Sequence, residues 1–160
     1  MVAAMVSLIL VVNSADAVVT RSSGAVVSAA GQVDDRIKSQ IRIVHATGEL
    51  DKNGAWQDTN SDGDFDIFLW VKNVGVTRIS SVTDSDLFLG QQGNFSRIQH
   101  QTEAAGVKPY WQYSVENGTE WAQSDTIKVT VHYSTTLATG IYLVKLVIPN
   151  GVFDELTFSI

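Results

Sequence analysis

The stretch Thr126–Tyr133, TIKVTVHY, alternates apolar and polar side chains almost from one residue to the next. Successive side chains of a strand point to opposite faces of a sheet, so this alternation is typical of a half-buried β-strand. Val, Ile, Thr and Tyr are also residues that strands prefer. The stretch therefore predicts a strand with one face in a core and the other toward solvent.

Six further runs of similar character lie between Ile41 and the carboxyl end. In the first, IRIVHA, the alternation places Ile41, Ile43 and His45 on one face. The other runs are DIFLWVKNVG, RISSVTDSDLFLG, YWQYSV, IYLVKLVIPNG and DELTFSI. Seven or so short strands separated by Gly, Asn and Asp turns predict an antiparallel β-sandwich over residues 41–160.

Turn residues divide these runs. The third run is expected to end in a turn at Gly90. Pro149-Asn150-Gly151 predicts a tight hairpin between the last two strands, because Asn-Gly readily adopts positive φ. The four tryptophans are expected to pack in the core or on the sheet: Trp56, Trp70, Trp111 and Trp121.

The composition of the chain restricts its function. Its 160 residues are 44% apolar and 18% charged, which is typical of a globular domain. The net charge of −6 and the lack of a visible basic face argue against nucleic acid as a partner. With no cysteine, the chain has neither a disulfide framework nor a thiolate metal site.

The first forty residues differ from the remainder. Met1 to Val12 is nearly all apolar, and no Lys or Arg occurs before Arg21. Small and apolar side chains then recur every three or four residues, which predicts one long helix over residues 1–40 that serves as a membrane anchor or assembly helix. The predicted seam is Val12, Ala15, Val19, Ser22, Val26, Ala29, Val33 and Ile37.

The segment DTNSDGDFD, residues 58–66, matches the first half of a calcium loop, D-x-[DN]-x-[DN]-G. An EF-hand has a bidentate Glu at the twelfth position, where this chain has Leu69, so the segment is not an EF-hand. The alternative is a polar hairpin tip whose Asp and Asn side chains favour Asx-turns. The predicted ligands of a structural Ca²⁺ are Asp58, Asn60, Asp62, Asp64 (through its backbone carbonyl) and Asp66.

No enzymatic motif occurs in the chain, and the sequence predicts a binding or assembly module. His45, His100 and His132 are far apart and share no metal-ligand spacing. There is no nucleophile elbow, P-loop or dinucleotide fingerprint. Two N-x-S/T triplets make Asn94 and Asn117 possible glycosylation sites.

Three strings of the sequence resemble the archaellin superfamily: IRIVHATGELDKNG, DIFLWVKNVGVTRISSVTDSDLFLG and GIYLVKLVIPNGVFDELTFSI. An apolar amino-terminal helix before a small all-β domain is the plan of type IV pilin-like subunits. Within the superfamily, the sequence is most similar to the FlaG and FlaF accessory stator proteins of the archaeal flagellum, or archaellum.

The resemblance implies a mainly β fold: an immunoglobulin-like sandwich outside the membrane, with a long helix anchored at it. It also implies a non-enzymatic cell-envelope protein that assembles with itself or a paralogous subunit. Such a stator couples the rotary motor to the surface layer by protein–protein contact. Family members begin with a short basic leader, whereas this chain starts at Met1 inside the apolar run.

Two alternatives stand beside the stator. One is archaellin itself, the self-polymerising filament subunit in an extracellular filament. The other is a calcium-stabilised surface- or glycan-binding sandwich, for which Tyr110, Trp111 and Tyr113 would form an exposed aromatic cluster. For assembly, an exposed edge of the sandwich is expected to pair or stack with a neighbouring subunit.

Overall fold

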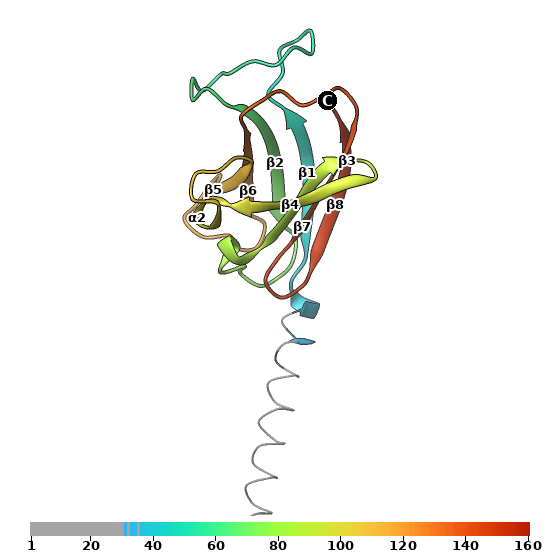
Figure 1. Ribbon diagram of the computed structural model, residues 1–160. Coiled ribbons are helices and arrows are strands. Elements are labelled where there is room, and N and C mark those ends of the chain that lie inside the picture. The colour runs from blue at the N-terminus through green and yellow to red at the C-terminus, as the bar shows by residue number, and fades with distance from the viewer. Residues whose placement is uncertain (1–30, 32, 35) are drawn as a thin grey trace, which may run out of the picture. The chain divides into compact units, whose positions relative to one another are not determined.

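A computed structural model describes residues 31, 33, 34 and 36–160 of the chain (Figure 1). Within it, Lys38–Ile160 form one compact unit. This unit holds eight strands, a short 3-10 helix η1 and a short α-helix α2. Their bounds are β1 Ile41–Gly48, β2 Phe65–Asn73, η1 Val82–Asp84, β3 Asp86–Gln91, β4 Asn94–His100, α2 Gln101–Ala104, β5 Tyr110–Val115, β6 Thr126–Tyr133, β7 Ile141–Val147 and β8 Phe153–Ser159.

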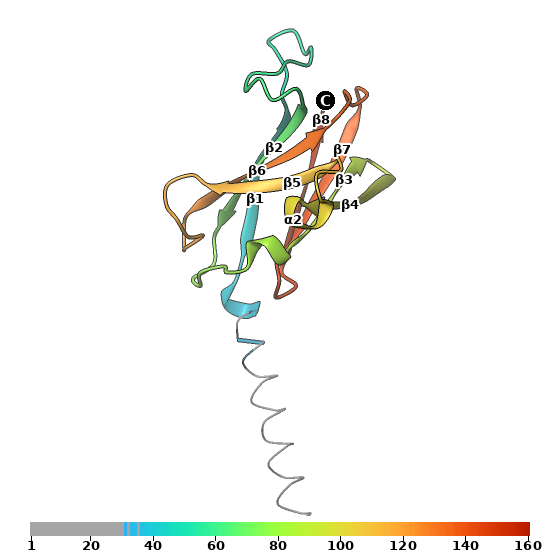
Figure 2. The same ribbon diagram turned by 60° about the vertical axis from the view of Figure 1, so that its left-hand side comes forward.

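The eight strands form one hydrogen-bonded sheet in the order β1-β2-β6-β5-β4-β3-β7-β8. All neighbours are antiparallel except β4 and β5, which run parallel and pair only at Gln99↔Tyr110 and His100↔Trp111. The sheet curls until its two edge strands, β1 and β8, lie side by side (Figures 1 and 2). The backbone N–H of Ile43 donates to Oδ2 of Asp154 at 2.7 Å, which ties these edges together.

The predicted antiparallel immunoglobulin-like sandwich of about seven strands is therefore wrong. Residues 38–160 fold into one continuous mixed sheet of eight strands, with a single parallel pair. The sequence prediction missed β4, because its first four residues, Asn94–Arg97, are all exposed. Only Ile98 and His100, at its end, are buried, so most of β4 lacks the alternation of apolar and polar residues by which strands are recognised.

The prediction of a long amino-terminal helix is also wrong for the described residues. Apart from helical residues at 31, 33, 34 and 36–38, the described chain contains only η1 and α2. None of the described helices is long and apolar enough to span a bilayer. Of the predicted seam, Val33 and Ile37 are 56% and 77% exposed, and the positions from 12 to 29 lie outside the described residues. The domain division at residue 40 stays a prediction.

The core lies on the concave face of the sheet and is built from alternate positions along the strands. Ile67, Leu69 and Val71 of β2 are fully buried, while the residues between them face outward. Burying each such aliphatic side chain stabilises the fold by about 1.5–3 kcal/mol. The prediction for the tryptophans is confirmed for Trp111 and Trp121, which belong to the same core.

Strand β1 departs from strict alternation. Its register against β2 shifts between Ile43 and His45, so that one extra residue is accommodated as a bulge. Val44 and His45 are both exposed in consequence, and Ala46 returns to the core. The prediction that His45 shares a face with Ile43 is wrong, because a bulge reverses the faces of all residues that follow it.

One of the two predicted turns is confirmed. At Gly151 φ is 82°, and the N–H of Ile148 donates to the carbonyl of Val152 at 2.9 Å, closing the hairpin between β7 and β8. Gly90, in contrast, lies inside β3 directly opposite Phe95 of β4. The turn occurs three residues later, at Gly93, where φ is 89°.

Candidate metal centre

A row of polar side chains crosses the outer face of the sheet. Because odd-numbered residues of β2 and β6 face the core, Asp66 and His132 point the other way, and the two are paired across the strands. Tyr110 of β5 pairs with His132 on its other side. Asp66 and His132 are nevertheless only 0% and 4% exposed, because the loop that precedes β2 lies beside them.

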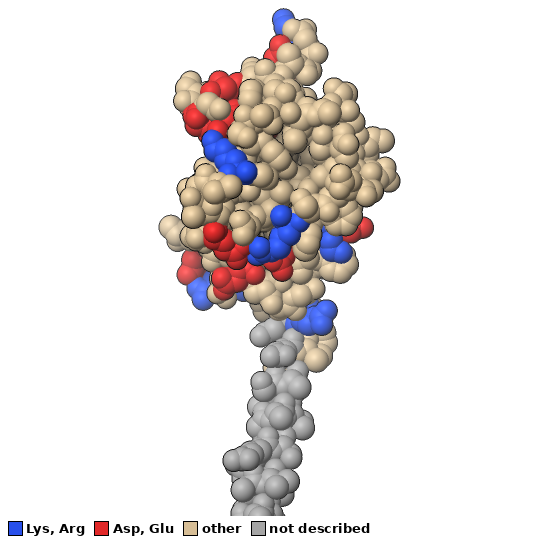
Figure 3. All heavy atoms as spheres, viewed as in Figure 1, with Lys and Arg blue, Asp and Glu red and all other residues tan. Residues whose placement is uncertain are grey.

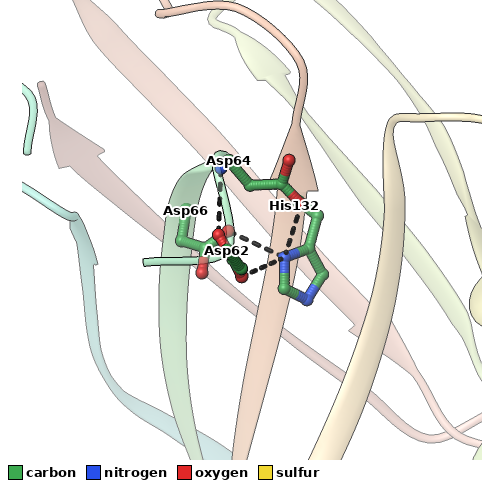
Figure 4. A group of neighbouring side chains, drawn as sticks. All are labelled: Asp62, Asp64, Asp66 and His132. Atoms are coloured by element: carbon green, nitrogen blue, oxygen red, sulfur yellow. Dashed lines mark hydrogen bonds and ion pairs between the residues drawn. The ribbon is translucent and has the colours of Figure 1, made fainter. Parts of the chain in front are cut away.

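Three carboxylates surround one nitrogen of the His132 ring, as Figure 4 shows. Nδ1 of His132 lies 2.9 Å from Oδ1 of Asp66 and 3.4 Å from Oδ2 of Asp64. It lies 3.6 Å from Oδ2 of Asp62. One donor atom from each of the four residues can be chosen so that all lie within 4.8 Å of one another, an arrangement that can hold a metal ion.

Two of these atoms are buried without a hydrogen bond. Neither Nδ1 of His132 nor Oδ1 of Asp66 has a hydrogen-bond partner, so the two atoms, although close, are not aligned for one. Buried polar atoms are nearly always satisfied. On the far side of the ring, the Gln112 side-chain amide lies 2.9 Å from Nε2 of His132 and fixes the ring orientation. Tyr110 packs against the ring at a centroid distance of 5.0 Å.

The electrostatics of the group follow from this crowding. The Asp66 carboxylate is the largest cause that raises the pKa of His132; burial opposes it, and the charges of Asp62 and Asp64 add to it. Nζ of Lys108 forms an ion pair with Oδ1 of Asp64. The hydrogen bond to Asp64 raises the pKa of Lys108 in turn. Figure 3 shows acidic side chains gathered near the loop that precedes β2, with a basic side chain beside them.

The loop before β2 is organised by its own side chains. The two carboxylate oxygens of Asp58 accept the backbone N–H groups of Asp62 at 3.2 Å and of Gly63 at 3.0 Å. Nδ2 of Asn60 donates to Oδ2 of Asp62 at 2.8 Å and to Oδ2 of Asp66 at 3.3 Å. Asp58 and Asn60 therefore shape the loop, as the Asx-turn alternative predicts.

A buried glutamate fastens the same loop to the domain. Oε1 of Glu49 accepts the backbone N–H of Thr59 at 2.6 Å, and Glu49 is only 3% exposed. The backbone N–H of Glu49 donates to the carbonyl of Asp66 at 2.8 Å. The acidic loop is thus held both by its own turns and by the end of β1.

Of the five ligands predicted from the sequence, the structure brings three together: Asp62, Asp64 and Asp66. Asp64 faces the group with its side chain, whereas the sequence predicted a backbone carbonyl ligand. The sequence prediction also missed His132, since the β2–β6 pairing that carries it to Asp66 is not visible in one sequence. The calcium ion itself stays a prediction.

The remaining predicted sites are separate from this group. Asn94 begins β4 and Asn117 lies in the loop between β5 and β6; both are exposed, and their glycosylation stays a prediction. Trp111 is 0% exposed, with its ring packed edge-on against His100 at 4.6 Å. It therefore cannot present its face to a sugar, which removes the central ring of the expected aromatic cluster.

Comparison with solved structures identifies the class of this fold. The chain resembles the archaellum periplasmic stator protein FlaG from Sulfolobus acidocaldarius, with 22% identity and a TM-score of 0.58 over 75% of this chain and 99% of that chain. It also resembles the archaellum periplasmic stator protein complex FlaF and FlaG from the same organism. There the identity is 23% and the TM-score 0.55, over 74% of this chain and 88% of the other.

The resemblance to archaellum stator proteins that the sequence predicts is thus confirmed at the level of the fold. No family model matches the sequence, and no curated protein matches it significantly.

Proposed function

We propose that this chain is a non-enzymatic accessory subunit of an archaellum, a stator-type protein of the cell envelope. The observation that carries the proposal is the structural likeness to FlaG, which extends over 99% of that stator protein. The whole stator fold therefore has a counterpart in this chain. Its role is mechanical: the domain resists torque between the rotary motor and the envelope through contacts with other proteins.

The proposed partner is a paralogous subunit of the same fold. The second similar structure is a complex of two stator proteins, FlaF and FlaG, which supports pairing of related domains. The backbone of Ile43 and the side chain of Asp154 join the two edge strands of the sheet. A continuous sheet of this kind suits a domain under mechanical load, because it is not divided into two separate layers.

The exposed edge of β4 is the proposed contact surface. Residues 94–98 pair with β3 on one side, and no strand of the described chain covers their other side. Unpaired N–H and C=O groups of such an edge can pair with a strand of another subunit. Phe95, 45% exposed, adds an apolar side chain whose ring packs edge-on against Phe88 at 6.4 Å. Figure 2 shows the β3–β4 hairpin projecting from the domain.

The test is binding of the full chain to a paralogous stator subunit from the same organism, measured by analytical ultracentrifugation. A discrete complex is expected. Phe95→Asp is expected to weaken it at least about tenfold, equivalent to about 1.4 kcal/mol. Phe153→Asp, which changes another exposed phenylalanine on the distant strand β8, is the matched control. Absence of any complex contradicts the proposed function, while equal binding by both variants contradicts only the choice of edge.

A further inference from the structure

In the group of Asp62, Asp64, Asp66 and His132, the distances from Nδ1 of His132 to the carboxylate oxygens are those expected between donor atoms around one ion. Two donors about 2.1 Å from a metal lie about 3.0 Å apart at a right angle and about 3.4 Å apart at the tetrahedral angle. From Nδ1 of His132, the three carboxylate oxygens lie at 2.9, 3.4 and 3.6 Å.

The buried imidazole nitrogen supplies an independent indication of a ligand. His132 is 4% exposed, and its Nδ1 points at the carboxylates without a hydrogen-bond partner (Figure 4). Nε2 of Gln112 lies 2.9 Å from Nε2 of His132. With the amide oxygen and nitrogen of Gln112 exchanged, the oxygen accepts a hydrogen bond from the Nε2–H of His132. Nδ1 then carries the free lone pair, and such support of the second ring nitrogen is usual for metal-bound histidine.

The formal charge of the group matches a divalent ion. Three carboxylates and the Lys108 ammonium, which is paired with Asp64, together carry a charge of minus two. One divalent cation neutralises that charge. Lys108 binds Oδ1 of Asp64 and leaves Oδ2 facing His132, so the ammonium does not take the place of the ion.

The donor set distinguishes between metals. Ca²⁺ takes six to eight oxygen ligands, whereas this group offers one imidazole nitrogen and three carboxylates. Mixed nitrogen and oxygen donors in a compact, four-ligand arrangement suit Zn²⁺. We propose that Asp62, Asp64, Asp66 and His132 bind one Zn²⁺ ion, which fastens the acidic loop to the outer face of β2 and β6.

The proposal is tested by calorimetric titration of the chelator-treated full chain with ZnCl₂ and, separately, with CaCl₂. One Zn²⁺ per chain is expected, bound more tightly than Ca²⁺. His132→Gln and Asp66→Asn are each expected to weaken Zn²⁺ binding more than about tenfold, and Gln112→Ala by about 10–100-fold. His45→Gln, which removes an exposed histidine outside the group, is expected to leave binding unchanged.

A measurement on the unaltered chain covers the case in which a variant fails to fold. The ring-nitrogen NMR signals of the three histidines are recorded with and without Zn²⁺. A shift of Nδ1 in His132, with His45 and His100 unchanged, is expected. Tighter binding of Ca²⁺ than of Zn²⁺, Zn²⁺ binding unaffected by His132→Gln, or unchanged His132 signals would each overturn the proposal.

Discussion

At the scale of the residue, single buried polar side chains connect the loops of this domain to its sheet. Asn73 at the end of β2 is fully buried and uses its whole amide. Its Nδ2 donates to the carbonyls of Thr77 at 2.8 Å and Trp121 at 3.2 Å, and its Oδ1 accepts the N–H of Gly75 at 3.1 Å. One side chain therefore joins two loops that are distant in sequence.

Asn73→Ala is expected to destabilise the domain. The N–H of Gly75 and the carbonyl of Trp121 keep backbone partners in Gln40 and Ile79, but the carbonyl of Thr77 loses the hydrogen bond from Nδ2. A loss of about 1–3 kcal/mol, the usual cost of an unsatisfied buried polar group, is therefore expected. Urea denaturation measures the free energy of unfolding. Asn117→Ala, which changes an exposed asparagine in a loop, is the control. Equal stability of the two variants would show that the Asn73 network contributes little.

His100 is expected to make the stability of the domain depend on pH. Burial lowers its pKa from the ordinary value of 6.5, against the opposing charges of Glu103 and Asp84. Its Nδ1 accepts the N–H of Thr102 at 3.3 Å at the start of α2. Since the unfolded chain takes up the proton more readily, this contribution is complete above about pH 6.5 and is lost as the pH falls through the folded pKa.

His100→Asn is therefore expected to reduce the loss of stability on acidification, because asparagine can cap α2 without titrating. The free energy of unfolding is measured at about pH 7.5 and about pH 5, on either side of the ordinary histidine pKa. The difference between the two values should be smaller in the variant than in the unaltered chain. An identical difference in both proteins would rule out His100 as the cause.

At the scale of the element, the β3–β4 hairpin depends on Gly90. A Cβ atom at this position would lie 2.5 Å from the carbonyl oxygen of Asn94 and 2.6 Å from Cα of Phe95. Both atoms belong to the backbone of β4, so neither moves without displacing the strand. The close approach explains why a glycine stands inside a strand rather than in a turn.

Gly90→Ala is expected to lower the free energy of unfolding by about 1–3 kcal/mol, the usual cost of overpacking. Gly118→Ala is the matched control, because a Cβ atom there would come no closer than 3.8 Å to the nearest atom. Both are measured by thermal and urea denaturation. If the Gly90 variant is as stable as the control, the two strands are less closely packed than described.

The sequence predicted well the strands that have one buried face. Thr126–Tyr133 is β6 to the residue, and the alternation of Ile127, Val129 and Val131 gives its buried side. Prediction failed where no local pattern exists: β4 is exposed along its first half, and the bulge after Ile43 changes the face of β1 without changing its composition.

The site was predicted in part for a related reason. The even spacing of Asp62, Asp64 and Asp66 signals a cluster of oxygen ligands within one short segment. His132 joins them only because β2 pairs with β6, and such pairing is set by the packing of the whole sheet. The pairing of two strands that are distant in the chain cannot be predicted from the local sequence of either strand.

At the scale of the whole molecule, residues 38–160 form a curled sheet with a continuous core. Residues 94–98 of β4 pair with a strand on one side only. This edge and the tie between β1 and β8 are consequences of strand order. The likeness to FlaG covers 75% of this chain and 99% of that protein. The proposed accessory subunit would lie at the cell envelope, in contact with other proteins, whereas archaellin would be found along the filament.

Immunogold electron microscopy of intact cells, with an antibody against the β domain, tests this distinction most directly. We expect the label at the cell envelope where each archaellum emerges, with none along the filament. A deletion strain that lacks the gene is the control for antibody specificity. Label along the filament shaft would contradict the stator assignment in favour of archaellin, and label unrelated to archaella would contradict both.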